Sequence, residues 1–489
     1  MIDWLALAVA LPLLGAVGAV MLPGRAPAIG LAGAVLTTSA ALSVGLLVAQ
    51  GTALRSDLGG WGAPLGIALA ADGLSAALLV MANLVALCIS VYALDYFGAG
   101  SRRHFWPLWL LLWAALNGLF LAADLFNLYV TLELLGISAA ALGALTGRPE
   151  AVGANLRYLL VGLLGSMTYL LGVALLYAGL GTLDLKLAAA ALTPGPLAWT
   201  VFALMVGGLL LKAALFPLHF WLPPAHAQAP APVSAALSAL VVKAAFYLVL
   251  RLWVDLFGAV TDGGAATLLG ALGTGAVVWG SWRAFRAERL KLLAAYSTVA
   301  QVGYLFLFFP LLAGAPATQR QDLLGAVLLL ALTHGFAKAG LFLSAGLLQK
   351  AAGHDRIADL GPSIQGLPAV ALAIGLAGVA LVGLPPSGTF IAKWVLLSSA
   401  IGSGQWWWAP GVVLGTLLAS AYVFRVLANA FDQGPRHGSL HDARGELAAA
   451  PVSIGGLAQA VPLLMTLIAV AVLGLEAEPL WDLLQDRSP

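Results

Sequence analysis

The sequence is poor in charge. Only 9% of its 489 residues are Asp, Glu, Lys or Arg, whereas 61% are hydrophobic, and the mean hydropathy is +0.98. Soluble domains carry roughly 25% charged residues, so the solvent of this chain must be lipid. The 23 basic and 21 acidic residues nearly cancel, and the basic ones are scattered along the chain. This pattern argues against nucleic acid as a partner, because phosphate backbones require clustered Lys and Arg.

Cysteine is almost absent. Cys88 is the single one, inside an apolar run, so this chain alone cannot form a disulfide, an iron–sulfur cluster or a thiolate metal site. The sequence also lacks a P-loop, a nucleophile elbow, a dinucleotide fingerprint and the His/Cys spacing of a metal site. We therefore expect no catalytic residue, no metal and no cofactor in this chain, and no redox or hydrolytic site of its own.

Long apolar runs separated by short polar segments predict transmembrane helices, because a bilayer core needs about 20 apolar residues per helix. The first run, Ile2 to Leu22, lacks a basic start and a cleavage site, so we expect a span and not a signal peptide. The predicted fold class is an all-α polytopic membrane protein with about fourteen transmembrane helices. These lie near residues 2–22, 28–50, 72–97, 104–121, 124–145, 152–180, 196–223, 229–257, 265–283, 289–312, 320–349, 366–401, 409–431 and 453–475.

Basic residues are concentrated in one set of loops, as is typical of the cytoplasmic side. That set contains Arg25, Arg102, Arg103, Arg148, Arg157, Arg283, Arg286, Arg289, Lys291, Lys350, Arg356, Arg436 and Arg444. The alternate set contains Arg55, Lys186, Arg251, Arg320 and Arg487. We therefore predict a multi-pass protein of the bacterial inner membrane with both termini on the outer face. The longest polar stretch, Asp432 to Glu446, is too short for a soluble domain.

Five ionisable residues fall well inside the predicted spans: Glu133, Lys212, Lys243, Lys338 and Lys393. A charge at the bilayer centre costs about 2.5–3.5 kcal/mol even on a lenient scale, so each needs a partner, water or a function. Burial makes the proton of a lysine easier to release. A nearby glutamate that can be withdrawn would then act as a switch. The pattern predicts a path for protons.

Three histidines bear on this path. His334 precedes Lys338 by four residues, which places both side chains on one helical face. His219 and His226 lie at or beyond the cytoplasmic end of the seventh predicted helix. They are candidates for proton uptake, and the alternative for both is that they cap carbonyl groups or meet water.

Proline interrupts two of the predicted spans close to a lysine. Pro217 follows Lys212 by five residues, and Pro385 and Pro386 precede Lys393. Such breaks free backbone carbonyls and are tolerated at depth only inside protein or beside a hydrated cavity. We expect water to reach both sites.

Purely structural roles are alternatives for several of these residues. A single intramembrane lysine can form a structural ion pair or extend to the interface, and Glu133 could be a static counter-ion. Asp72, Asp95 and Asp124 lie at predicted helix ends and are expected to be interfacial anchors. The tryptophans at 406–408 match an aromatic belt.

Five strings carry a family resemblance. They are DLFNLYVTLELLGISAAAL, LLLKAALFPLHFWLPPAHAQAPAPVSAALSALVVKAAFYLVLRL, LLAAYSTVAQVGYLF, THGFAKAGLFLSAG and GLPPSGTFIAKW. Over about residues 70–430 the chain resembles the antiporter-like subunits of respiratory complex I, membrane-bound hydrogenases and Mrp cation/proton antiporters. The FNLYV string, Lys393 and the lack of a long C-terminal extension look most like the D subunit of the Mrp antiporters.

The resemblance implies a division of the chain. Helices 1–3 would occupy residues 1–103, and two inverted five-helix repeats would occupy residues 104–257 and 258–431. A loop, helix 14 and an outward tail would occupy residues 432–489. Helices 7 and 12 would be broken.

The resemblance also implies roles for the ionisable residues. Glu133 and Lys212 would be the coupling pair and Lys243 the next relay. His334 with Lys338 would form the central connection. Lys393 would be the site toward the outer half-channel. The family usually carries acids where Pro224 and Gln228 stand here, which bears on proton uptake from the cytoplasm.

The implied function is a proton-translocating subunit of a multisubunit Mrp-type antiporter. Its partners would be protons, sodium or another monovalent cation, lipid, and other membrane subunits, with no cofactor. One alternative is a proton-pumping subunit of complex I or of a membrane-bound hydrogenase. Another is a structural scaffold whose buried charges only hold helices together.

Overall fold

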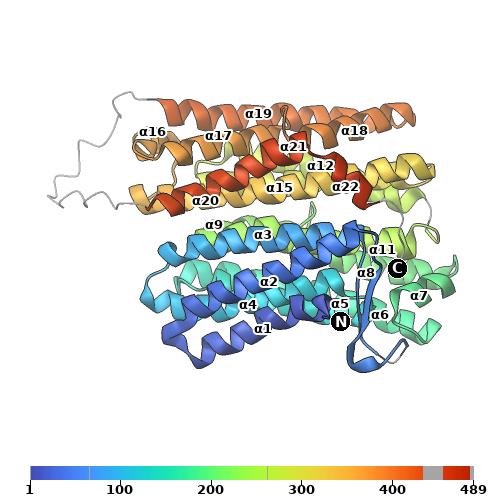
Figure 1. Ribbon diagram of the computed structural model, residues 1–489. Coiled ribbons are helices and arrows are strands. Elements are labelled where there is room, and N and C mark those ends of the chain that lie inside the picture. Colours follow the sequence, from blue (N-terminus) through green and yellow to red (C-terminus); the bar gives the residue numbers. More distant parts are fainter. Residues whose placement is uncertain (1, 65, 262, 433–454, 485–489) are drawn as a thin grey trace.

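The computed structural model is a bundle of long helices whose axes run side by side (Figure 1). It describes residues 2–432 and 455–484, apart from 65 and 262. In this part of the chain, twelve helices are long and apolar enough to cross a bilayer, and two further predicted spans are each divided into shorter helices. The all-α polytopic class is thereby confirmed. The described residues do not include Arg436, Arg444, Arg487 or most of the polar stretch from Asp432 to Glu446.

The N-terminal part contributes three spans and a small hairpin. The helices are α1 (Trp4–Met21), η1 (Pro23–Arg25), α2 (Ala26–Ala49) and α3 (Gly73–Tyr96). Between α2 and α3 the strands β1 (Leu54–Asp57) and β2 (Ala68–Ala71) pair antiparallel, with η2 (Leu58–Gly60) between them. The hairpin was not predicted from the sequence.

The next segment passes through the first broken helix. It consists of α4 (Ala99–Leu121), α5 (Leu125–Gly143), α6 (Pro149–Leu180), α7 (Leu185–Ala191), α8 (Pro196–Lys212), α9 (Leu222–Gln228), α10 (Ala231–Ala236), η3 (Leu237–Val241), α11 (Val242–Leu252) and η4 (Trp253–Phe257). The elements η3 and η4 are π turns that continue α10 and α11.

The remaining helices include the second broken one. They are α12 (Gly263–Arg286), α13 (Leu290–Phe306), α14 (Phe309–Leu312), α15 (Ala317–Ala352), η5 (Ile357–Asp359), α16 (Leu360–Ile364), α17 (Pro368–Val382), α18 (Gly388–Gly402), η6 (Trp406–Trp408), α19 (Ala409–Phe431), α20 (Gly456–Leu467), the π turn η7 (Ile468–Val472), α21 (Leu473–Leu475) and α22 (Glu478–Leu483).

The two predicted breaks are present, and each leaves backbone carbonyls without a helical partner. After α8, Ala214 adopts a left-handed φ of 52° before the chain passes Pro217 and enters α9. After α17, Gly383 has a φ of +83°, and α18 begins after Pro386 with Ser387 as its N-cap. Proline cannot supply the amide hydrogen that a continuous helix requires, which explains why both helices stop here.

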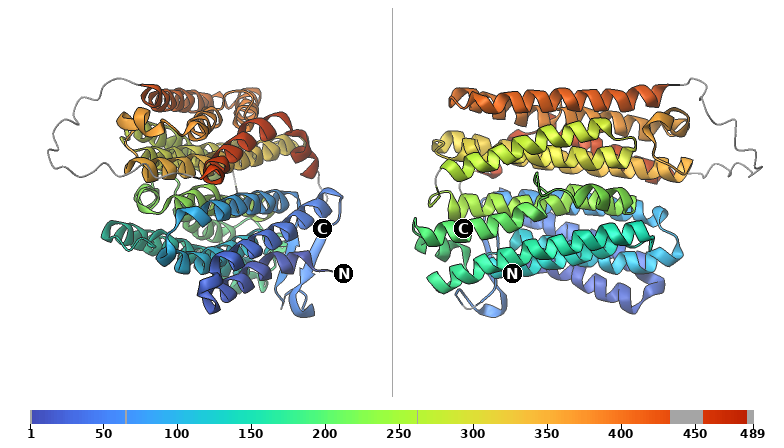
Figure 2. Two further views of the ribbon diagram at one scale, coloured as in Figure 1. Left: turned by 60° about the vertical axis from the view of Figure 1, so that its left-hand side comes forward. Right: turned by 180° about the vertical axis from the view of Figure 1, so that it is seen from behind.

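The centre of the bundle is formed by α10–η4 and α15, whose most apolar stretches are completely buried. The 36-residue α15 packs against α10, α13, α17, α18 and α20. The helices α1 and α19 lie at opposite edges of the bundle (Figures 1 and 2). Polar side chains on α11 and α15 are therefore the ones farthest from lipid.

Small residues allow α6 and α8 to approach closely. A Cβ atom on Gly208 would lie 2.3 Å from the Gly165 carbonyl oxygen, so a larger residue cannot occupy this position without separating the helices. Close contact through glycine is a common way for helices to pack in lipid, where no hydrophobic effect drives them together. It sets the position of the end of α8, where Lys212 lies.

Candidate functional site

Glu133 and Lys212 meet across the first broken helix. Glu133 is on α5, and its Oε2 lies 3.5 Å from the Nζ of Lys212, the last residue of α8. The amine also lies 3.3 Å from the Leu132 carbonyl oxygen, and the Ser166 hydroxyl donates to the Glu133 carboxylate. Both charged side chains are largely buried. The family resemblance implied that these two residues pair, and the structure brings them into contact.

A glycine on α5 makes room for the amine. A Cβ atom at Gly136 would stand 3.2 Å from the Lys212 Nζ, and one at Gly165 would stand 3.2 Å from the Lys212 Cγ. The lysine therefore passes between two glycine-lined helix surfaces. This packing holds the ammonium group beside the carboxylate without a bulky neighbour.

Lys243 follows a π turn, η3, that could not be predicted from the sequence. In η3 the amide of Val242 bonds to the carbonyl of Leu237, five residues back. The Lys243 amine donates to the Ser238 carbonyl in the same turn, and the Ser238 and Thr298 hydroxyls are 2.7 Å apart. A π turn shifts the backbone bonding pattern and is frequent at functional sites. Here it supplies the carbonyl that receives a buried lysine.

Lys338 and His334 lie on one face of α15, as their spacing predicts. The Lys338 amine donates to the Ala294 carbonyl at 2.7 Å and to the Ser297 hydroxyl, both on α13. Neither ring nitrogen of His334 has a hydrogen-bond partner in the described part of the protein, although the ring is buried. Lys243 is close enough for its charge to act on both residues. These three side chains form the centre of the line.

Lys393 lies at the second break. Its amine donates to the Val382 carbonyl at the end of α17 (3.0 Å) and to the Thr416 hydroxyl of α19 (3.1 Å). It also sits 4.1 Å from the centre of the Tyr304 ring, a cation–π contact. Gln301 donates to the neighbouring Leu381 carbonyl at 2.8 Å. The carbonyl groups freed by the break thus accept hydrogen bonds from Lys393 and Gln301.

One arrangement is common to the buried lysines. In the described residues these are Lys212, Lys243, Lys291, Lys338 and Lys393, and each donates to a backbone carbonyl. A carbonyl dipole stabilises a buried ammonium group less than a carboxylate would. Lys212 is the one member of this set with an ion pair to a carboxylate in the described structure.

The placement of Lys291 in a loop was wrong. Lys291 is in the first turn of α13 and is buried, with its amine donating to the Ala229 carbonyl. Its own amide donates to Asp355, which also pairs with Arg289 at 2.8 Å. Because the residue follows several arginines at a helix end, its sequence context is that of a loop cation. No sequence signal distinguished it from its neighbours.

The two histidines proposed for proton uptake are in different surroundings. His226 on α9 is completely buried, packs against Phe342, and has no partner for either ring nitrogen in the described part of the chain. Lys243, Lys291 and Lys338 lie around it. His219 lies within the break and stacks on Phe216. A buried polar group without a partner costs about 1–3 kcal/mol, so His226 occupies a position that favours water.

An ion-pair cluster closes the other end of α11. Arg251 bonds to Asp72 and to Asp255 (3.3 Å), so its assignment to a loop was also wrong: it is part of α11 and mostly buried. Burial of the Asp72 carboxyl opposes ionisation, but the Arg251 charge and hydrogen bonds from Arg251 and Ser75 prevail and lower its pKa to about 2. Asp72 also caps α3, and Asp124 caps α5, as expected of residues at helix ends.

Comparison with known proteins gives the family. The transmembrane family described as NADH:quinone oxidoreductase/Mrp antiporter matches residues 122–419. The matched segment includes Glu133, Lys212, Lys243, His334, Lys338 and Lys393. The chain belongs to this family. It is therefore a multi-pass membrane protein related to subunits of multisubunit membrane complexes.

Relatives within the NADH:quinone oxidoreductase/Mrp antiporter family come from both of its branches. NADH-quinone oxidoreductase subunit N of Desulforudis audaxviator is 36% identical, over 88% of this chain and 86% of its own length. The D subunit of the Na(+)/H(+) antiporter of Alkalihalophilus pseudofirmus is 27% identical, over 87% and 84%. A chain in the structure of the Mrp complex from Dietzia sp. matches with a TM-score of 0.88 and 26% identity, over 99% of this chain and 96% of that one. The family resemblance is confirmed, and these relatives do not single out the Mrp branch.

Proposed function

We propose that this chain carries protons across the membrane along Glu133, Lys212, Lys243, His334 with Lys338, and Lys393, as one subunit of a larger membrane complex. The observation that carries the proposal is the buried contact of Glu133 with Lys212 beside a helix break. A buried ammonium is costly without a facing carboxylate. Withdrawal of Glu133 would therefore drive the proton from Lys212 toward the next acceptor.

The route has an uptake side and a release side. We propose that His226 and Lys291, with His219 nearer the break, receive protons from the cytoplasm, because Pro224 and Gln228 stand where the family resemblance implies acids. Lys393 would pass protons to the outer half-channel.

We also propose the two inverted repeats at residues 104–257 and 258–431. In each, the fourth of five spans is the broken one, namely α8–α9 and α17–α18, which supports the division. The chain would lie in a bacterial inner membrane with its termini outside, as the loop charges indicate. The start of α1, the β-hairpin and α22 lie at one end of the bundle (Figure 1), which supports termini on one side.

Proton movement along these residues could be driven in either of two ways. The FNLYV string and Lys393 favour an Mrp-type antiporter that exchanges protons for sodium or another monovalent cation. The 36% identity to subunit N of an NADH-quinone oxidoreductase favours a pump that is driven by electron transfer in other subunits. The assay that separates them uses inverted membrane vesicles containing the native complex and a pH-sensitive dye.

Proton movement started by NaCl or KCl would support antiport, and movement started by an electron donor would support the redox-driven pump. Lys212→Ala should abolish either response, whereas Lys350→Ala, at an exposed helix end, should not. Full activity in Lys212→Ala would contradict the assigned role. Loss of complex assembly, with normal flux in whatever assembles, would indicate a scaffold.

A further inference from the structure

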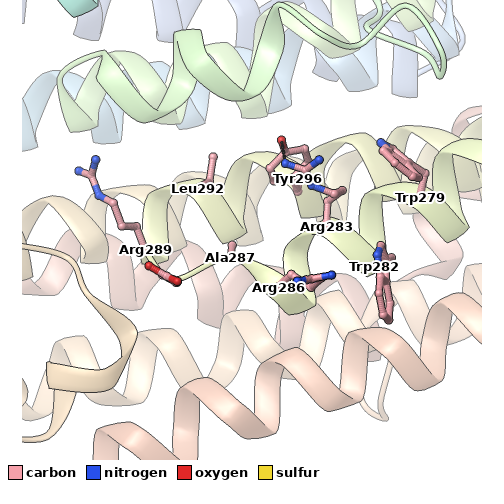
Figure 3. A pocket seen from close by; sticks show the side chains of 9 residues that line it. Trp279, Trp282, Arg283, Arg286, Ala287, Arg289, Leu292 and Tyr296 are labelled. Atoms are coloured by element: carbon pink, nitrogen blue, oxygen red, sulfur yellow. Dashed lines mark hydrogen bonds between the residues drawn. The ribbon is translucent and has the colours of Figure 1, made fainter.

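A cavity lined by arginine and aromatic side chains lies where α12 ends and α13 begins. Its volume is about 570 Å³. The lining residues are Trp279, Trp282, Arg283, Arg286, Ala287, Glu288, Arg289, Leu292 and Tyr296. Figure 3 shows Arg283 and Arg286 between Arg289 at one end and the indole rings of Trp279 and Trp282 at the other. None of these side chains is a member of the proposed proton route, although Arg289 shares Asp355 with Lys291.

Aromatic rings hold two of the arginines in place. The Arg283 guanidinium lies 4.8 Å from the Tyr296 ring centre and 5.9 Å from that of Trp279, and it donates to the Tyr296 hydroxyl at 2.9 Å. The Arg286 guanidinium lies 5.8 Å from the Trp282 ring centre. Stacking fixes the plane of a guanidinium and leaves its edge N–H groups to bind an anion.

Two carboxylates lie near the three arginines of the cavity. Asp355 pairs with Arg289 at 2.8 Å. Glu288 is itself one of the lining residues. In the residues that the structure describes, neither Arg283 nor Arg286 has an ion pair with a carboxylate. The cavity therefore carries an excess of positive charge that calls for an anion.

The surroundings indicate where that anion comes from. The cavity lies at the end of an apolar, membrane-crossing helix, and both Trp279 and Trp282 are more than 40% exposed. Exposed tryptophan on a spanning helix is typical of the lipid headgroup level. Basic pockets between transmembrane helices suit phospholipid headgroups. An anion delivered on a lipid would enter from the side, where its acyl chains could lie along α12.

We propose that this cavity binds the phosphate headgroup of an anionic phospholipid, with Arg283 and Arg286 as the phosphate ligands. The indoles of Trp279 and Trp282 would pack against the glycerol region. Trp279 also lies 6.2 Å from the Phe216 ring of the first helix break. The bound lipid would thus lie beside the non-helical segment that follows Lys212.

The test is native mass spectrometry of the full chain, titrated with phosphatidylglycerol, phosphatidylcholine or inorganic phosphate. The wild-type protein should retain phosphatidylglycerol in preference to both other probes. Each arginine replaced should weaken this binding about fivefold, so R283Q/R286Q should bind about 25-fold more weakly. The matched control R25Q/R103Q removes two exposed arginines from the same set of basic loops and should bind as the wild type does.

Three results would overturn the proposal. One is equal retention of phosphatidylglycerol and phosphatidylcholine, and another is equally strong binding of inorganic phosphate. The third is unchanged phosphatidylglycerol binding in R283Q/R286Q. If R283Q unfolds because it loses the hydrogen bond to Tyr296, phosphatidylglycerol binding by R286Q alone tests the proposal. Arg286 makes its described contact with the ring of Trp282 and has no such hydrogen bond in the described structure.

Discussion

The energy of the Glu133–Lys212 contact can be measured with Glu133→Gln, Lys212→Met and the double substitution. The two charged atoms lie 3.5 Å apart, and the side chains are 16% and 6% exposed. At that separation and an effective dielectric constant of about 20, their attraction is about 5 kcal/mol. Each single substitution leaves the other charge buried without its partner, and we expect it to lower the free energy of unfolding by about 3–5 kcal/mol.

The double substitution removes both charges together. It should cost less than the sum of the single losses, with a coupling energy of about 2 kcal/mol or more. The free energies come from denaturant unfolding of the full chain in one detergent, and proton flux comes from proteoliposomes with an entrapped pH dye. All three variants should lose flux. Lys350→Met, at an exposed position, should change stability by less than about 0.5 kcal/mol and keep flux.

Two outcomes would refute this reasoning. Strictly additive losses of stability would mean that the contact carries no pair energy and that Glu133 is no counter-ion. Flux that survives Lys212→Met in correctly folded protein would mean that the proton does not pass through this amine.

Three further outcomes are expected. Gly208→Ala should destabilise the protein by about 1–3 kcal/mol in denaturant unfolding, because the new Cβ would lie 2.3 Å from a carbonyl oxygen of α6. The control Gly207→Ala should leave the stability unchanged, because no atom lies within 4 Å of its Cβ position. The Asp72 carboxyl, with its pKa lowered to about 2, contributes stability above its unfolded pKa of about 3.9. This contribution, about 2.5 kcal/mol from a shift of about 1.9 pKa units, is lost progressively as the pH falls from about 4 through 2. An acid titration of Asp72→Asn should lack this loss, and an unchanged profile would show that the Arg251 pair does not stabilise the protein. Lys393→Met should abolish proton flux in proteoliposomes. It should change the free energy of unfolding by about 1 kcal/mol or less, because in the described structure Lys393 is bound by a carbonyl and a hydroxyl and its loss leaves no carboxylate unpaired. Preserved flux would show that Lys393 is not on the route.

The sequence predicted those features that hydropathy and proline determine. Apolar run length located the spans, and Pro217 with Pro385 and Pro386 located the two broken helices, because proline removes a backbone donor wherever it stands. The family resemblance implied that Glu133 and Lys212 form a pair, and the structure shows them in contact. Hydropathy places both residues within spans but does not say how the helices are rotated, so it could not predict this contact.

Other features depend on three-dimensional packing and were missed. The π turn before Lys243 is made of LSALV, whose residues suit an α-helix equally well. Lys291 and Arg251 were placed in loops because they lie near helix ends, but burial there is decided by Asp355 and Asp72, which are distant in sequence. The partners of most buried lysines are carbonyl groups, which no residue type identifies.

This choice of partner has a consequence for how the protein can vary. A main-chain oxygen is present whatever amino acid occupies Ser238, Ala294 or Val382, so mutation of these neighbours leaves the acceptor of each lysine in place. Only a change of helix geometry, such as loss of the π turn or repair of a break, would remove it. We therefore expect distant relatives to tolerate wide substitution around the lysines while retaining the irregular backbone beneath them.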